Sequence, residues 1–113
     1  MSCLFCKVVA KEIPAAILFE SAEAVVFRDI HPAAPTHFLV IPRKHIASVH
    51  EAKPEDAALL GHLLMAARDV AEKEGLADDG YRLVINTGLN AGQSVFHIHV
   101  HVLGGRNLAW PPG

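Results

Sequence analysis

Cysteine is scarce in this chain of 113 residues: there are 2 in all, so any disulfide framework would be thin and we expect a reducing compartment. Basic residues are not in excess either, because 10 Lys and Arg face 12 Asp and Glu, for a formal net charge of −2. Proteins that bind polymeric nucleic acid normally carry a basic surplus, so we expect no such partner. No apolar run reaches the roughly 18 residues that span a bilayer, and no signal peptide is visible. We therefore expect a cytoplasmic protein without a membrane partner.

Histidine, by contrast, is abundant. The chain has 8 histidines, and three of them lie within residues 97–101. Hydrophobic residues make up 51% of the chain and charged residues 19%, which is the composition of a globular protein. The length suits a single domain over residues 1–113. The function should therefore be sought through histidine chemistry.

The pattern of apolar residues predicts short strands around one long helix. The clearest helix runs from Pro54 to Gly75, where Leu, Val and Ala recur at i, i+3 and i+4 spacing. Residues 4–12 predict a short N-terminal helix closed off by Pro14. Strands are predicted where β-branched and aromatic residues gather between turn signals, at residues 16–20, 24–30, 37–42, 81–86 and 95–103. Together these elements favour an α+β fold with a five-stranded, mainly antiparallel sheet.

Histidines alternate with aliphatic residues along the predicted strand 95–103. Successive side chains of a strand point to opposite faces, so one face would be buried and the other would carry the histidines. Neighbouring imidazoles would start roughly 6.6 Å apart and the outer pair roughly 13 Å, whereas zinc holds each ligand at about 2 Å. Three histidines of one straight strand could not easily share an ion, so the row suggests divided tasks. The buried face would be Ile98, Val100 and Val102, and the other face His97, His99 and His101.

A single histidine in such a pattern is most simply a polar residue on the solvent face of a strand. Three in register, followed directly by Gly104 and Gly105, are not expected from random placement. Clustered imidazoles suit proton transfer near neutral pH. They also suit nucleophilic attack on phosphorus, because the leaving group of a phospho-imidazole is easily protonated.

The segment His97–Leu103 resembles the His-x-His-x-His signature of the histidine triad superfamily. Residues 35–42 (PTHFLVIP), 92–95 (GQSV) and 110–113 (WPPG) resemble its histidine triad nucleotide-binding protein branch. The resemblance extends from about Phe5 to Gly113 and implies a histidine triad-like (HIT-like) fold. The galactose-1-phosphate uridylyltransferase branch typically has Gln at the third triad position, where this chain has His101.

The resemblance implies a role for three histidines. His99, the middle triad residue, would be the nucleophile that attacks the α-phosphate of a nucleoside phosphoramidate and forms a nucleotidyl-histidine intermediate, which water hydrolyses. His101 would contact the phosphate and help to protonate the leaving amine. His37, on a neighbouring strand, would hold the nucleophile and assist proton movement.

Nucleotide contacts are implied in the same way. Asp29 would bind the ribose, with strand termination as the plain alternative, and Asn86 would lie near the ribose or phosphate, with turn capping as the alternative. A purine slot would be lined by Phe27, Ile30 and Leu39, of which Phe27 and Leu39 are equally compatible with simple core.

The loop before the triad would bind the phosphate. A glycine turn allows backbone N–H groups to approach phosphate oxygens, and a serine hydroxyl adds a donor, so Gly92, Gln93 and Ser94 are the candidates. An ordinary connecting loop is the alternative. The resemblance also implies a homodimer, in which Trp110 of the C-terminal tail reaches the partner's active site.

Cys3 and Cys6 have the C-x-x-C spacing of a zinc site, although a full site needs two more ligands. Redox chemistry and a pair of free thiols are the alternatives. The resemblance implies His45 and His97 as the remaining ligands, in a closed site whose zinc would be structural. No function is assigned to the other histidines, His31, His50 and His62.

Three functional classes follow. The first is a purine nucleoside phosphoramidase acting on adenosine or guanosine 5′-phosphoramidates. The second is a dinucleoside polyphosphate hydrolase of the same fold, which the C-terminal segment 110–113 disfavours. The third is a nucleotide- or zinc-binding regulatory module with little turnover.

Overall fold

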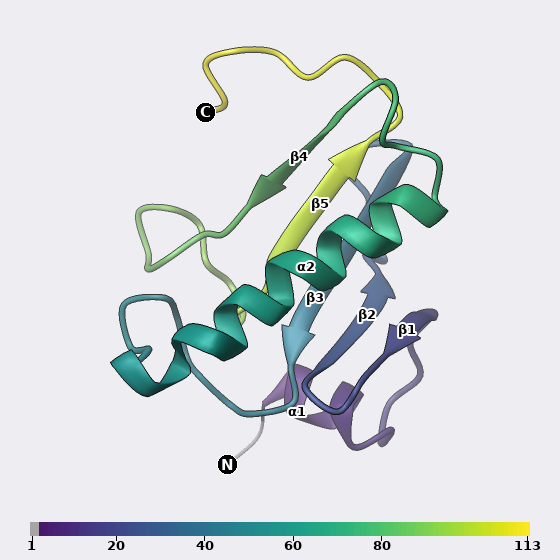
Figure 1. The fold of residues 1–113 in the computed structure, drawn as a ribbon. Coiled ribbons are helices and arrows are strands. Elements are labelled where there is room, and N and C mark those ends of the chain that lie inside the picture. Colours follow the sequence, from purple (N-terminus) through teal and green to yellow (C-terminus); the bar gives the residue numbers. More distant parts are fainter. Residues whose placement is uncertain (1–2) are drawn as a thin grey trace.

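The structure is a computed structural model and describes residues 3–113. A short helix comes first, two hairpin-connected strands and a third strand follow, and a long helix separates them from the last two strands (Figure 1). In chain order the elements are α1 (Leu4–Val9), β1 (Ile17–Glu20), β2 (Ala24–Arg28), β3 (Thr36–Pro42), the 3₁₀ helix η1 (Pro54–Asp56), α2 (Ala57–Lys73), β4 (Tyr81–Val84) and β5 (Val100–Gly104).

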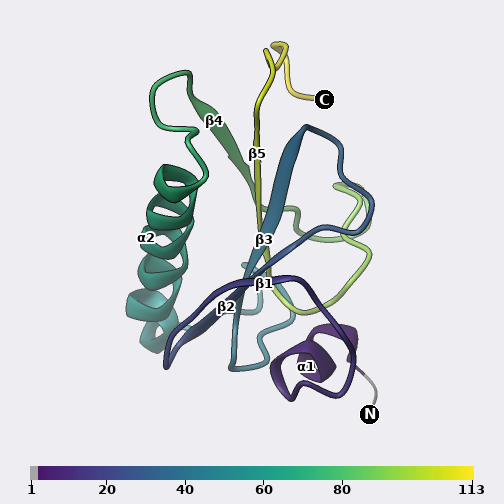
Figure 2. The same ribbon diagram turned by 90° about the vertical axis from the view of Figure 1, so that its right-hand side faces the viewer.

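The strands form one five-stranded sheet in the order β1-β2-β3-β5-β4. Every neighbouring pair is antiparallel, which confirms the predicted α+β fold. Figure 2 shows α2 along one side of the sheet and α1 on the other. In the described part of the chain, no helix combines the length and apolar composition that a membrane span requires.

The α2 side of the sheet is a hydrocarbon core. Even-numbered residues of β2, β3 and β5 point toward the helix, as the two-residue period of a strand requires. Leu63, Ala67 and Val70 of α2 pack against them, with exposed fractions of 3% or less. Leu64, which the helical spacing placed on the same face, is 43% exposed. The sheet residues of this cluster are Ala24, Val26, Phe38, Val40, Val100 and Val102.

The opposite side of the sheet packs against α1. Odd-numbered residues of β2 and β3 (Val25, Phe27, Leu39 and Ile41) form a second cluster with Phe5 and Val8 of α1. His37 and His101 also lie at odd positions, and the register pairs His37 with Leu103 and Leu39 with His101. The two histidines are therefore diagonal neighbours on the α1 side of the sheet.

The predicted strand 95–103 is too long, because β5 begins only at Val100. Its ladder with β3 ends at the pair Val40–Val100, just before Pro42, which has no N–H to donate. The carbonyl of Pro42 accepts a hydrogen bond from Nε2 of His97 at 2.8 Å, and the N–H of Ile98 donates to the carbonyl of Ile46 instead. The first two triad histidines therefore lie in irregular backbone.

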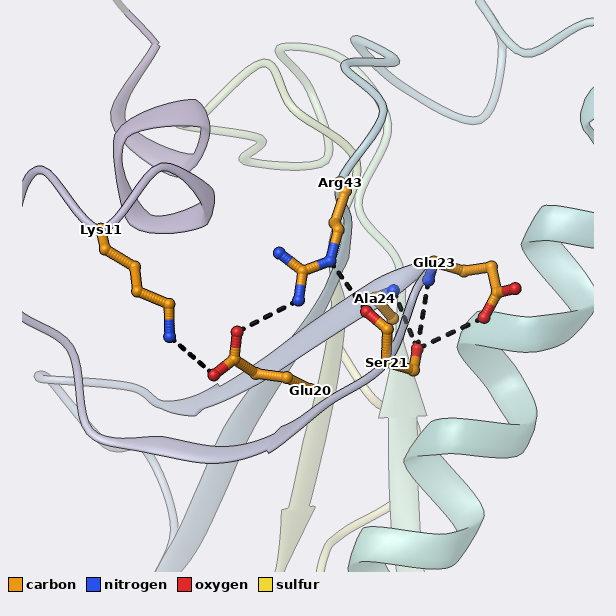
Figure 3. Close-up of polar contacts among 6 residues, drawn as sticks. All are labelled: Lys11, Glu20, Ser21, Glu23, Ala24 and Arg43. Atoms are coloured by element: carbon orange, nitrogen blue, oxygen red, sulfur yellow. Dashed lines mark hydrogen bonds and ion pairs between the residues drawn. The ribbon is translucent and has the colours of Figure 1, made fainter.

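A polar cluster ties the β1–β2 hairpin to the segments on either side (Figure 3). The carboxylate of Glu20 accepts from Lys11 Nζ at 2.7 Å and from Arg43 Nη2 at 3.1 Å, and these bonds hold the pKa of Glu20 below its ordinary value. Arg43 Nε also donates to the carbonyl of Ser21 at 2.8 Å, and the Ser21 hydroxyl accepts from the N–H of Ala24. Because Lys11 follows α1 and Arg43 follows β3, the cluster fixes the segment after α1 relative to the sheet.

Candidate functional site

The structure brings together His37 of β3, His101 of β5 and His99, which immediately precedes β5. Nε2 of His37 lies 2.9 Å from Nδ1 of His101. The rings of His99 and His101 have centroids 4.9 Å apart. His37 and His99 are 7% and 6% exposed, so two of the three imidazoles are largely withdrawn from solvent.

Hydrogen bonding determines which nitrogen of each ring carries the proton. The N–H of Ala33 donates to Nδ1 of His37 at 3.0 Å, so His37 is protonated at Nε2. That Nε2–H donates to Nδ1 of His101, which makes His101 the tautomer with its proton on Nε2. The carboxylate of Asp29 is a more distant acceptor, 3.4 Å from the same His37 nitrogen. His101 therefore presents an N–H donor to a ligand.

His99 has the opposite tautomer. Its Nδ1 lies 2.8 Å from the backbone carbonyl of His97 and must donate, because a carbonyl oxygen only accepts. In the neutral ring, Nε2 therefore carries the lone pair. The ring is held edge-on against Phe5, with a centroid distance of 5.0 Å. A potential nucleophile, His99, and a hydrogen-bond donor, His101, thus lie side by side.

The pKa values favour neutral imidazoles. Burial lowers the pKa of His101 to about 4, and the neighbouring His99 and His37 add to the effect. Burial also lowers the pKa of His37, although the nearby carboxylate of Asp29 opposes the shift. Near neutral pH both rings are uncharged, as the hydrogen-bonded chain between them requires.

A cavity of about 280 Å³ opens beside these histidines, close to the lower limit of roughly 300 Å³ for small-molecule sites. Seven of the residues predicted to act on the nucleotide line it: Phe27, Asp29, Ile30, Leu39, Ser94, His99 and His101. His37 lies behind His101 as its hydrogen-bond partner. A larger cavity of about 500 Å³, where β4 begins and β5 ends, has neither histidine nor cysteine among the described residues that line it.

Other predicted nucleotide contacts lie outside this lining. Gln93 is 4% exposed, and its amide braces the loop: Oε1 accepts from the N–H of Gly88 at 2.8 Å and Nε2 donates to the carbonyl of Ala47 at 2.7 Å. Gly92 has φ +84°, a conformation that favours glycine at this turn. Asn86 follows β4 and is half-buried, and Trp110 is 80% exposed beside Arg82.

Sequence reasoning missed the contribution of α1 to the cavity wall. Leu4, Phe5 and Val8 all line the cavity, and none of them was predicted to do so. The available signal was the pairing of Cys3 and Cys6 with His97, since it places the first helix beside the triad. Asp29 also closes its strand as the alternative suggested, because its carboxylate accepts the N–H of His31 at 2.8 Å.

Cys3, Cys6, His45 and His97 form a second cluster, whose ligand atoms all lie within 4.8 Å of one another. An ideal tetrahedral zinc centre has S···N edges of about 3.6 Å and N···N edges of about 3.3 Å. The corresponding distances are 3.4 Å from Cys3 Sγ to His97 Nδ1, 3.4 Å from Cys6 Sγ to His45 Nδ1, and 3.2 Å between the two Nδ1 atoms. The cluster can therefore hold a metal ion.

The surroundings of this cluster also suit a cation. His97 is 0% exposed and uses Nε2–H to bond Pro42, so its Nδ1 lone pair points at the sulfur atoms. Burial and the neighbouring Cys3 thiol raise the pKa of Cys6. A divalent ion would reverse that local field and favour thiolates.

Known proteins are similar to this chain in sequence and in fold. Residues 10–108 match the HIT domain family. An uncharacterized HIT-like protein of Synechococcus elongatus is 54% identical over 110 residues, which is 97% of this chain and 96% of that protein. A HIT family hydrolase from Legionella pneumophila has a TM-score of 0.97 and 51% identity, covering 99% of this chain and 100% of that one. A HIT family hydrolase from Clostridium thermocellum has a TM-score of 0.93 and 45% identity, covering 96% of this chain and 94% of that one.

Proposed function

Because the chain belongs to the HIT domain family, we propose that it hydrolyses purine nucleoside 5′-phosphoramidates through a nucleotide bound covalently to His99. The observation that carries the proposal is the pair of opposite tautomers at one cavity. His99 offers a lone pair on Nε2, and His101 offers a proton on Nε2. The proposal includes membership of the histidine triad nucleotide-binding protein branch, which rests on the motifs in residues 35–42, 92–95 and 110–113.

In the first step, Nε2 of His99 attacks the α-phosphorus and the P–N bond to the amine breaks. The imidazole gains positive charge as the new P–N bond forms. Its Nδ1–H remains on the carbonyl of His97, 2.8 Å away, which stabilises that charge and fixes the ring orientation. The carbonyl thus acts as the orienting acceptor for the nucleophile.

The leaving amine must receive a proton. That proton is taken up from solvent as the P–N bond breaks, and the Nε2–H of His101 donates a hydrogen bond to the departing nitrogen. His37 keeps this N–H on the cavity side, because its own Nε2–H occupies Nδ1 of His101 across 2.9 Å. In the second step, water attacks the phosphorus and one proton returns to solvent, and the nucleoside monophosphate leaves with His99 regenerated.

The rest of the cavity holds the nucleotide. Phe27, Ile30 and Leu39 offer apolar surface to the purine, and the Asp29 carboxylate accepts from ribose hydroxyls. The Ser94 hydroxyl donates to the phosphate from the cavity wall. The net charge of −2 does not oppose an anionic substrate, since local donors determine the field within a cavity.

The metal of the second cluster is proposed to be zinc. Two sulfur and two imidazole ligands are a typical closed set for structural zinc, which contributes folding energy and leaves no position for a catalytic water. Cys3, Cys6, His45 and His97 would hold it at their Sγ and Nδ1 atoms. The ion would take no direct part in the chemistry at phosphorus.

The working unit is proposed to be a homodimer. Trp110 is 80% exposed in a C-terminal segment that has little core of its own. The indole is therefore available to a second copy of the chain, where it would help to select the leaving group. Sheet edges also favour pairing, because their backbone groups lack partners.

The test is to trap the intermediate. Incubation with an adenosine phosphoramidate, followed by rapid alkaline quench and mass spectrometry, should reveal an AMP adduct on the peptide that contains His99. His99→Ala should bind AMP but form no adduct and lose turnover, whereas His50→Ala, at an exposed position outside the site, should behave as wild type. If His99→Ala kept more than about a tenth of wild-type kcat, a loss of less than about 1.4 kcal/mol, the nucleophile would be misassigned. Faster turnover of a dinucleoside polyphosphate than of the phosphoramidate would overturn the substrate class.

A further inference from the structure

His97 belongs to both functional clusters. Its side chain is part of the metal-binding group, with Nδ1 3.4 Å from Cys3 Sγ and 3.6 Å from Cys6 Sγ. Its backbone carbonyl accepts the Nδ1–H of His99 and so determines the tautomer and orientation of the nucleophile. His97 therefore links the two clusters: its side chain is a metal ligand, and its backbone carbonyl is hydrogen-bonded to the ring of His99, whose Nε2 is the attacking atom.

The helix α1 makes a second connection. Cys3 precedes it and Cys6 lies within it, while Leu4, Phe5 and Val8 form one wall of the cavity. Phe5 packs edge-on against His97 and His99, with centroid distances of 6.0 Å and 5.0 Å. The residues that would bind the metal and the residues that line the cavity are thus interleaved within residues 3–8.

This helix is too short to be stable alone. It has 6 residues, well below the roughly 12–15 residues at which isolated helices become marginal in water. Two buried residues, Phe5 and Val8, hold it to the sheet. The thiols of Cys3 and Cys6 contact His97 and His45 through weak sulfur–nitrogen hydrogen bonds of 3.4 Å, which a shared metal ion would replace with much stronger coordination bonds. Ion binding would therefore determine how firmly the cavity wall is held.

We propose that metal binding by Cys3, Cys6, His45 and His97 controls nucleotide binding in the adjoining cavity and holds His99 for attack. The inference rests on the proposed function and adds a regulatory role for the metal centre. Loss of the ion frees α1 from the loop before β5, opens the cavity wall and releases the carbonyl that orients His99. His97 is in this sense a positioning residue.

Calorimetric titration with AMP tests the coupling. Zinc-loaded protein should bind AMP about tenfold more tightly than the same protein stripped with a chelator, within the usual range of coupling between two sites. Linkage requires AMP to strengthen zinc binding by the same factor, which competition with a chromophoric chelator measures. Equal AMP affinity in the two states would overturn the inference.

Hydrogen exchange shows whether the effect is local. Removal of zinc should speed exchange of the amides in residues 3–9 and 95–99, while the amides of α2 keep their protection. Equal loss of protection in α2 would contradict the inference, because the metal would then support the whole fold and not the cavity wall.

A matched pair of variants removes the need for a chelator. His45 is an exposed ligand that does not line the cavity, so His45→Ala should weaken zinc binding and, without touching the nucleotide, raise KM and lower kcat. His50→Ala removes an exposed histidine outside the cluster and should change neither value. His45→Ala with wild-type KM and kcat would overturn the inference. If zinc-loaded wild-type protein neither binds AMP nor forms the His99 adduct, the proposed function fails and this inference fails with it; if it does both regardless of zinc, only this inference fails.

Discussion

Replacement of His101 by glutamine should flatten the acid side of the stability curve. Burial lowers the pKa of His101 from its ordinary value of 6.5 to about 4 in the folded chain. Between these values the unfolded chain binds a proton that the folded chain does not, so wild-type stability falls as the pH drops from about 6.5 to about 4. The full difference corresponds to about 3 kcal/mol. Because the ring is only half-buried beside an open cavity, we expect screening to reduce this to about 1–2 kcal/mol.

Urea unfolding at a series of pH values, from about pH 7 to about pH 4 and with a chelator present throughout, measures the effect. Glutamine cannot titrate, so the variant should lose about 1–2 kcal/mol less than wild type over that range. His62→Gln, at an exposed position of α2, is the control for loss of a histidine and should retain the wild-type slope. Parallel curves for wild type and His101→Gln would refute the idea that the fold keeps His101 neutral.

Three further substitutions test two glycines and the side chain of Gln93, which braces the loop before the triad. Gly61→Ala should stabilise the protein by about 0.5–1 kcal/mol, since nothing lies within 4 Å of the added methyl group and alanine favours helix. Gly104→Ala should destabilise it by about 1–2 kcal/mol, because the new methyl group would lie 2.8 Å from Cδ2 of the buried Leu76; thermal melts of the pair should shift in opposite directions. Gln93→Glu places a carboxylate oxygen against the Ala47 carbonyl and should cost about 1–3 kcal/mol in urea unfolding, so an unchanged midpoint would contradict the bracing role.

The sequence predicted elements well where one local period governs them. The helix expected from Pro54 to Gly75 is present as η1 followed by α2, and the order of strands along the chain is as expected. Burial of Ile98, Val100 and Val102 also followed from alternation. These features depend on residues that lie only a few positions apart, so the periodicity of the sequence is enough to predict them.

The failures involve partners distant in sequence. The sequence of residues 95–99 gives no sign that the β3–β5 ladder ends before them. The cause is Pro42, whose carbonyl bonds His97 across 55 positions of the chain. The contact of Phe5 with His97 and His99 was not predicted either, because these residues are also far apart in the sequence. Gln93 looked available to a phosphate because its bonds to the loop backbone appear only after the loop has folded.

The alternation of side chains along the strands places the residues that determine stability and the residues of the histidine cluster on opposite faces of the sheet. Even positions of β2, β3 and β5 pack against α2, whereas odd positions hold His37, His101 and the cavity wall. Volume-conserving substitutions on the α2 side could therefore change the stability of the protein with little effect on the histidines and the cavity on the opposite face of the sheet. Proteins of this fold from a thermophile and a mesophile could therefore differ in the core between the sheet and α2 and still keep the same histidine cluster.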